Sequence, residues 1–229
     1  MNKLKQHVYG ILRWTERYTK TDMVYLTKGM SWLSFGQLIG SASALVLAII
    51  FANFVPKETY GTYKFILSIV AVLSIPTLGG MGTAVINATA RGFDKTVERI
   101  ARIKIIWGLL SSLASMILSI YYFANHNTIL AICFLVAALF IPAMESYGIF
   151  GYFLQGKKQF NTLTRYFTIS QIISLIALTV TVILTDNIIL ILLAYFIPWT
   201  ITRFIFFLSL IHISEPTRLR RISYAVFCL

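Results

Sequence analysis

Six long runs of apolar residues constrain this chain more than any other feature. The hydrocarbon core of a bilayer is about 30 Å thick, and about 20 residues of helix cross it. The runs that reach this length are 32–54, 63–86, 103–124, 128–154, 166–185 and 187–208. The runs are continuous rather than alternating, so they predict helices and not the strands of a barrel. We expect an all-α polytopic membrane protein built as a six-helix bundle.

The composition supports this assignment. Hydrophobic residues make up 58% of the 229 residues, charged residues only 12%, and the mean hydropathy is +0.78. A soluble domain carries roughly a quarter charged residues, so a soluble class is excluded. The two cysteines, Cys133 and Cys228, are far apart and predict neither a disulfide framework nor a metal site.

Basic residues alternate between the two sides of the predicted bundle. Fourteen lie before the first run or next to the loops that follow the second and fourth runs, and two lie near the first outer loop. The fourteen are Lys3, Lys5, Arg13, Arg17, Lys20, Lys28, Arg91, Lys95, Arg99, Arg102, Lys104, Lys157, Lys158 and Arg165, and the two are Lys57 and Lys64. Positive residues favour the cytoplasmic side, so we expect a cytoplasmic N-terminus. We interpret the net charge of +12 as a topology signal and expect no nucleic-acid partner.

The sequence divides the chain into three predicted regions. Residues 1–27 form a basic cytoplasmic segment, either an interfacial helix or a solvated tail, and residues 28–208 form the six-helix lobe. The final stretch, 209–229, reads "SLIHISEPTRLRRISYAVFCL" and differs from what precedes it. It resembles a translated sequencing adapter, and we expect it to be non-native; a basic cytoplasmic linker is the alternative.

Small and polar residues recur on single faces of four runs. On 103–124 they are Gly108, Ser112, Ser115 and Ser119, which predicts tight helix packing. The other three faces also carry long polar groups, which favours a shared polar cavity over plain packing. Those faces are Ser34, Gln37, Ser41, Ala44, Ala48 and Ala52; Ala138, Glu145, Gly148, Tyr152 and Gln155; and Thr164, Thr168, Gln171 and Ser174.

Proline and glycine interrupt three of the runs. Pro76 precedes Gly79 and Gly80, while Pro142 and Pro198 lie inside the fourth and sixth runs. Proline removes an internal hydrogen bond and permits a kink, so these five residues are candidate hinges of the kind found in transporters. The alternative is that proline and glycine are simply frequent in membrane helices.

One carboxylate, Glu145, lies inside the apolar fourth run. It is seventeen residues from Thr128 at the outer edge, or about 26 Å along a helix, and Arg203 is sixteen residues from Asn187, or about 24 Å. The matching depths allow an ion pair between the fourth and sixth runs. A cavity or substrate role, and coupling to a proton or cation, are the alternatives for Glu145.

The residues that often carry catalysis do not converge. The histidines His7, His126 and His212 are scattered, and the chain has no nucleotide-binding loop and no H-E-x-x-H motif. We therefore predict no catalytic residues, no metal site and no cofactor.

Two stretches resemble a known family. Residues 51–94 carry Tyr60-Gly61, the cluster of Gly79, Gly80 and Gly82, and a basic loop that begins at Arg91, and residues 152–160 read "YFLQGKKQF". This pattern is similar to that of polysaccharide-biosynthesis membrane proteins, the oligosaccharide flippases of the multidrug/oligosaccharidyl-lipid/polysaccharide superfamily. The family usually has twelve or more spans, so the chain resembles its N-terminal half.

The resemblance implies a transporter that flips undecaprenyl-pyrophosphate-linked oligosaccharides, such as O-antigen or capsule repeats, across the bacterial cytoplasmic membrane by alternating access. It implies several partners: the lipid-linked oligosaccharide, membrane lipid, a missing C-terminal lobe and other polysaccharide-assembly proteins. Arg203, Arg165 and Lys64 are then candidates to contact pyrophosphate or an acidic sugar. The alternatives are a multidrug or metabolite/cation antiporter that uses Glu145 as its coupling acid, and a membrane-embedded glycan-assembly enzyme or scaffold.

Overall fold

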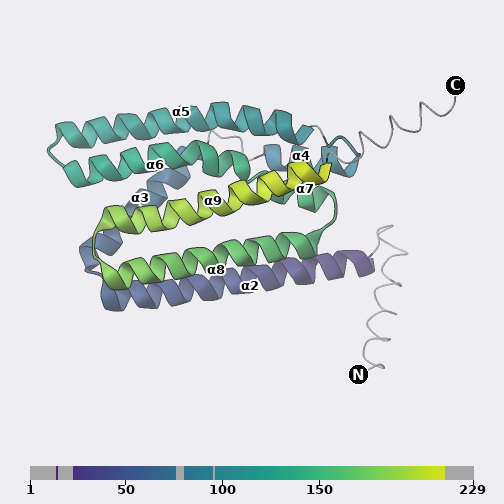
Figure 1. Ribbon diagram of the computed structural model, residues 1–229, viewed down its shortest axis with the longest axis horizontal. Coiled ribbons are helices and arrows are strands. Elements are labelled where there is room, and N and C mark those ends of the chain that lie inside the picture. The colour runs from purple at the N-terminus through teal and green to yellow at the C-terminus, as the bar shows by residue number, and fades with distance from the viewer. Residues whose placement is uncertain (1–13, 15–22, 76–79, 95, 215–229) are drawn as a thin grey trace.

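The computed structural model is a bundle of helices that run along a common long axis (Figure 1). It describes residues 14, 23–75, 80–94 and 96–214, and these contain no strand. The helices are α2 (Met23–Phe54), α3 (Lys57–Leu73), α4 (Met81–Ala90), α5 (Thr96–Ala124), α6 (Thr128–Tyr147), α7 (Phe150–Gly156), α8 (Phe160–Leu184) and α9 (Ile188–Ser214). The all-α polytopic membrane fold predicted from the sequence is confirmed.

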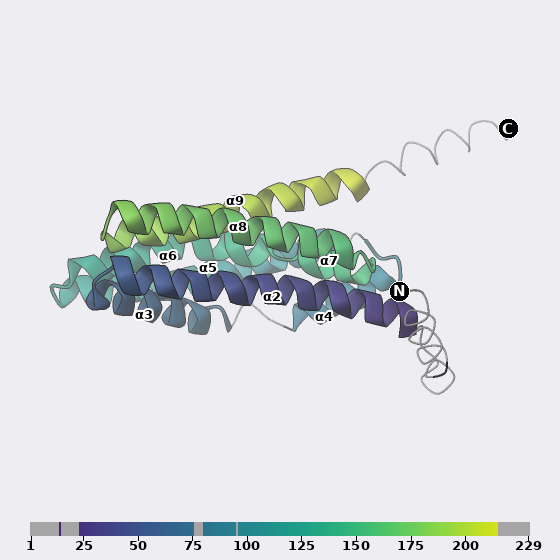
Figure 2. The same ribbon diagram turned by 90° about the horizontal axis from the view of Figure 1, so that it is seen from below.

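Five helical segments are long and apolar enough to cross a membrane. Four of them are the single helices α2, α5, α8 and α9, and the fifth is formed by α6 and α7 in succession. The predicted single helix over 63–86 is wrong, because α3 ends at Leu73 and α4 begins at Met81. With 17 and 10 residues, neither piece reaches the length of a span on its own. Figures 1 and 2 place α3 toward one end of the bundle and α4 toward the other, and in Figure 1 α3 lies obliquely to the long axis.

The predicted hinges in this second run have different outcomes. Pro76 and Gly79 lie outside the described residues. Gly80 directly precedes α4 as its N-cap residue, and its neighbourhood is open, because no atom lies within 4 Å of the position that a β-carbon would take there. The Gly80 hinge therefore stays a prediction.

The fourth run divides into α6 and α7, but the division is not at the predicted hinge Pro142. The helix α6 continues through Pro142 to Tyr147, and a turn at Gly148 and Ile149 precedes α7. Pro198 likewise lies inside the continuous helix α9. The two prolines are accommodated inside helices, so their role as moving hinges also stays a prediction.

The connections between helices gather at two opposite ends of the bundle. The short turns α2–α3, α5–α6 and α8–α9 lie at one end, and the connections α4–α5 and α7–α8 lie at the other, near the start of α2 (Figure 1). The second end carries the basic residues of the predicted cytoplasmic side, among them Arg91, Lys157 and Lys158. We call these the turn end and the basic end. The arrangement is the one that the alternation of basic loops predicts.

The helices α5 and α6 form the most closely bonded hairpin. Three serine hydroxyls of α5 donate to backbone carbonyls of α6: Ser112 to Ala138 at 2.6 Å, Ser115 to Phe134 at 2.8 Å and Ser119 to Ala131 at 2.7 Å. The stripe predicted to pack tightly on 103–124 therefore does so, through hydrogen bonds as well as close contact.

This hairpin also explains how α6 tolerates Pro142. Proline has no N–H, so the carbonyl of Ala138, four residues earlier, has no donor from the helix itself. Ser112 supplies the missing donor. One turn away, Gly108 allows the backbones to approach, because a β-carbon there would lie 2.8 Å from Cα of Pro142. A proline defect on one helix is thus matched by a glycine and a serine on its neighbour.

The helix α2 packs on α8 through glycines rather than through its predicted polar face. β-carbons at Gly29 and Gly36 would lie 2.7 Å from the Phe160 ring and 3.2 Å from the Thr164 methyl group. The predicted face is instead exposed along its whole length: Ser34, Gln37, Ser41, Ala44, Ala48 and Ala52.

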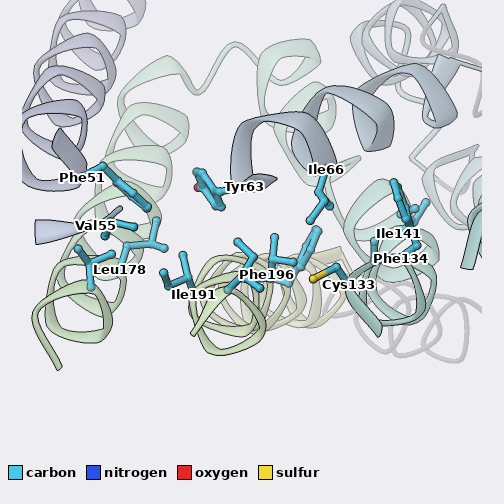
Figure 3. Packing of buried hydrophobic residues seen from close by; sticks show 14 residues of the cluster. Phe51, Val55, Tyr63, Ile66, Cys133, Phe134, Ile141, Leu178, Ile191 and Phe196 are labelled. Carbon is cyan, nitrogen blue, oxygen red and sulfur yellow. The ribbon is translucent and has the colours of Figure 1, made fainter. Parts of the chain in front are cut away.

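Buried apolar residues form two clusters. The first lies toward the turn end and joins α2, α3, α6, α8 and α9, with Phe51, Tyr63, Phe134 and Phe196 among its members (Figure 3). The second lies toward the basic end and joins α4, α5, α7 and α8, where Phe153 is one of its members. The interior is therefore not one continuous apolar core.

Most residues of the terminal regions proposed from the sequence lie outside the described residues. This holds for 1–13, 15–22 and 215–229. The helix α9 continues without a break from Ile188 to Ser214, across the predicted boundary after residue 208. The domain limits, and the non-native origin of 209–229, stay predictions.

Gly108→Ala tests the close approach of α5 and α6. The new methyl group would overlap Pro142, and we expect a loss of about 1–3 kcal/mol in the free energy of unfolding, typical of an overpacked site. The matched control is Gly61→Ala on α3, where no atom lies within 4 Å of the added carbon; alanine should be neutral or stabilising there. Thermal unfolding in detergent measures both. Equal melting temperatures for the two variants would contradict the packing.

Candidate functional site

A group of charged side chains lies inside the bundle, where α6 gives way to α7. Lys104 of α5 and Glu145 of α6 form an ion pair with 3.5 Å between Nζ and Oε2. The Lys104 side chain is 6% exposed and that of Glu145 is 27% exposed. Burying an ammonium group in hydrocarbon is costly unless it is paired, so Glu145 compensates a cation that the fold places away from water.

Arg203 reaches the same region from α9. Its Nη1 donates to the backbone carbonyl of Met144 at 2.8 Å, and its guanidinium carbon lies 5.0 Å from the centroid of the Trp199 ring. The Met144 carbonyl also accepts from the N–H of Gly148, at 3.3 Å. The last carbonyls of a helix carry partial negative charge, so Arg203 binds α6 at the place where that helix ends.

Gly148 makes room for this contact. A β-carbon at Gly148 would lie 3.3 Å from Nη1 of Arg203, tighter than ordinary packing. The turn between α6 and α7 therefore coincides with the arrival of a cationic side chain from another helix, and not with the proline six residues earlier.

Glu145 and Arg203 lie in the same region, as predicted, but the structure shows no direct ion pair between these two described residues. The two charges interact electrostatically, but Arg203 donates to the residue before Glu145, and the ion pair within 4 Å joins Glu145 to Lys104. Sequence reasoning had placed Lys104 in the basic loop, and this was wrong because Lys104 is buried within α5. A signal was present: Lys104 is one turn before Gly108 and continues the face that packs on α6.

We call Lys104, Glu145 and Arg203 the charge layer. Along α6 and α7 it falls between Ile141 of the turn-end cluster and Ile149 of the basic-end cluster. Two cations and one anion give the layer a formal charge of +1. In a low-dielectric interior, an excess cation attracts an anionic group strongly.

A pocket of about 240 Å³ lies between α2, α7 and α8. It brings together one residue from each of the three polar faces: Gln37, Gln155 and Thr164. The Thr164 hydroxyl donates to the carbonyl of Trp32 at 3.1 Å. Part of the shared cavity predicted from the sequence therefore exists, although Glu145 does not line it. The remaining lining residues are Leu33, Gly36, Leu163 and Phe167.

The other predicted site residues are dispersed. Gln171 is half-buried on α8, and Arg165 is exposed one residue beyond Thr164. Lys64 is exposed on α3 with its Nζ 5.5 Å from the Tyr60 ring centroid. Among the described residues, the structure shows no contact between these three and the charge layer. Their role in substrate binding stays a prediction.

A second ion pair ties the basic end together. Nζ of Lys157, just after α7, lies 2.7 Å from Oδ1 and 2.8 Å from Oδ2 of Asp94, in the connection after α4. The helices α4 and α7 also meet closely, because a β-carbon at Gly156 would lie 2.7 Å from Cβ of Thr89. Sequence reasoning assigned Lys157 to the membrane edge and missed this partner, which is 63 residues away.

The described residues contain no group of three or more histidine, cysteine, aspartate or glutamate side chains placed to hold a metal ion. The features that stand out inside the bundle are thus the charge layer and the amide-bearing pocket.

Together, the apolar helices and the internal charges define a multi-pass membrane protein. The comparison with protein families identifies which one: residues 26–221 match the family described as polysaccharide biosynthesis protein, and the chain belongs to that family. No curated protein and no solved structure matches the chain significantly. The resemblance seen in the sequence is therefore confirmed at the level of the family. The match extends beyond residue 208, into the segment expected to be non-native.

Substitutions in the charge layer should have unequal effects. Glu145→Gln removes the carboxylate that faces both cations, and we expect a loss on the order of 3 kcal/mol in the free energy of unfolding. Lys104→Met should cost less, because Glu145 still interacts with Arg203. The double variant Lys104→Met/Glu145→Gln should be more stable than Glu145→Gln alone. Thermal unfolding of the three variants measures this, with the exposed Lys57→Met as a control. A larger loss for Lys104→Met than for Glu145→Gln would contradict the arrangement.

Proposed function

We propose that this protein is a transporter that flips undecaprenyl-pyrophosphate-linked oligosaccharide repeat units across the bacterial cytoplasmic membrane, from the inner to the outer leaflet. The observation that carries the proposal is an excess cation inside a membrane bundle of the polysaccharide biosynthesis family. A lipid-linked glycan has an anionic pyrophosphate that must pass through a medium of low dielectric constant. A half-buried arginine such as Arg203 can meet that charge inside the bundle.

The basic end of the bundle indicates how the protein is oriented in the membrane. We infer that this end, and the N-terminus with it, faces the cytoplasm. The charge layer then lies on the cytoplasmic side of the middle of the bundle, because Glu145 is about 26 Å along the helix from Thr128 at the turn end. The substrate would reach this layer soon after it enters from the inner leaflet.

Transport would use two bodies that rock against each other. We infer that the described helices form one lobe and that a second lobe of the same protein is the partner. The turn at Gly148 and Ile149, where Arg203 binds α6, is the place where substrate contact and a change of helix direction could be linked. We propose Arg203 as the substrate-contacting cation, with Arg165 and Lys64 as secondary candidates along the path.

The pairing of Glu145 supports this choice over a cation or drug antiporter. A coupling acid has to take up and release its ion in each cycle. Glu145 is already held by Lys104, whose side chain is 6% exposed, so its release would leave that ammonium uncompensated. This pairing favours a Glu145 that stabilises the layer over one that exchanges ions.

Export in a deletion strain tests the proposal. Without this protein, lipid-linked repeat units should accumulate in the cytoplasmic leaflet, and surface polysaccharide should fall. Wild-type protein and the control Lys57→Met should restore export. Arg203→Met should restore less than a tenth of it, an effect of about 1.4 kcal/mol or more, while Arg203→Lys should be intermediate. Membrane levels of each variant are measured by immunoblot. Normal surface glycan in the deletion strain, with altered drug sensitivity, would contradict the proposal.

A further inference from the structure

The pocket between α2, α7 and α8 has a chemistry of its own, distinct from that of the charge layer. We propose that it binds a single uncharged sugar ring of the transported glycan. This inference rests on the proposed function, because it assigns part of the same substrate to a second place in the lobe.

The first observation is a pair of side-chain amides that form no hydrogen bond within the described part of the protein. Gln37 of α2 and Gln155 of α7 both line the pocket, and within the described part of the chain neither side chain has a hydrogen-bond partner. An amide that meets only apolar groups is unfavourable. Each amide offers two donors and one acceptor oxygen. A hydroxyl group both donates and accepts, so a ligand that carries several hydroxyls can satisfy both amides.

The second observation is the absence of charge from the lining. The seven residues around the pocket are Leu33, Gly36, Gln37, Gln155, Leu163, Thr164 and Phe167, and none is ionisable. A pyrophosphate or an acidic sugar would therefore find no counter-charge there. The leucines and Phe167 provide apolar surface, which suits the C–H face of a sugar ring, while the amides suit its hydroxyls. Apolar walls with a few placed polar groups are typical of small-molecule sites.

The size of the pocket limits what it holds. Its volume of about 240 Å³ falls just below the range of roughly 300–1,000 Å³ for sites that hold drug-sized ligands. One ring fits this space better than a chain of rings, so the rest of the glycan would lie outside. An acyl chain is the competing occupant, but it would cover both amides and give neither of them a partner.

The surroundings of the pocket favour a glycan over lipid. Ser34 and Ser41 flank Gln37 at one-turn spacing on α2, and all three are exposed. Lipid tails cannot hydrogen-bond a row of polar side chains, so this row is better matched by a polar substrate path. The pocket is also near the basic end: Thr164 is four residues, or about 6 Å, from the start of α8. Under the proposed orientation, the glycan would meet this pocket early.

Saturation-transfer NMR on the full chain tests the assignment. The protein is placed in phospholipid nanodiscs, free of sugar-based detergent, with millimolar methyl glycosides of neutral hexoses and N-acetylhexosamines as probes. Wild-type protein should transfer saturation to the ring protons of at least one probe. Gln37→Leu and Gln155→Leu should each weaken binding about tenfold, as expected for the loss of a polar contact. The matched control is Gln159→Leu, an exposed glutamine in the α7–α8 connection, which should leave binding unchanged.

Three results would overturn the inference: no transfer to any neutral glycoside, equal binding by wild type and both pocket variants, or stronger binding of methyl glucuronide than of the neutral glycosides. Gln37→Asn, which keeps the amide, should retain more binding than Gln37→Leu, and circular dichroism checks that each variant is helical. The assay measures binding without transport. Glycoside binding by a protein whose deletion leaves export unchanged would thus refute the proposed function but not the pocket, and the converse result would refute the pocket alone.

Discussion

Backbone carbonyls and charged side chains inside a bilayer are costly unless the protein itself supplies their partners, and this constraint organises the structure. The α5–α6 hairpin satisfies it with serine hydroxyls that donate to carbonyls of the facing helix, including the one that Pro142 leaves without a donor. The charge layer satisfies it with the Lys104–Glu145 ion pair and with the bond from Arg203 to Met144. The pairings of the charge layer connect α5, α6 and α9 at one depth, between the two apolar clusters.

The elements that depend on local chemistry could be predicted from the sequence. The thickness of the hydrocarbon core sets a minimum length that α2, α5, α8 and α9 all reach, and the small residues of α5 mark the face that packs on α6. The alternation of basic loops indicated the two ends of the bundle. The paired amides and the hydroxyl of the pocket were also visible, because Gln37, Gln155 and Thr164 each belong to a polar face.

The features that sequence reasoning missed depend on contacts between distant residues. Lys104 and Glu145 are 41 positions apart, and Met144 and Arg203 are 59 apart. The pattern of basic residues grouped Lys104 with the basic loop, yet its long side chain is buried and paired with Glu145 of α6. Proline content suggested Pro142 as a hinge, and sequence reasoning missed that Ser112 supplies the donor which the proline lacks and that the turn forms at Gly148. Whether a membrane helix breaks at a proline depends on whether a neighbouring helix supplies the hydrogen-bond donor that the proline lacks.

The described helices therefore present two separate chemistries, which match the two parts of the substrate that we propose. The charge layer, with its excess cation, would suit the anionic pyrophosphate of that substrate, and the uncharged amide pocket would suit a neutral part of its glycan. This division is consistent with a protein of the polysaccharide biosynthesis family. It requires that Glu145 be held by Lys104, so that Arg203 remains available where α6 ends.

A solid-state NMR distance in bilayers tests this requirement most directly. With ¹⁵N-lysine and ¹³C-glutamate labels, dipolar dephasing should connect Nζ of Lys104 to the carboxyl carbon of Glu145, as the 3.5 Å separation of Nζ and Oε2 demands. The signal should vanish in Lys104→Met, which assigns it. A second sample carries ¹⁵N-arginine in place of ¹⁵N-lysine. Dephasing of the Glu145 carboxyl in that sample, with none in the lysine-labelled one, would show that Arg203 is the ion-pair partner and would contradict the account.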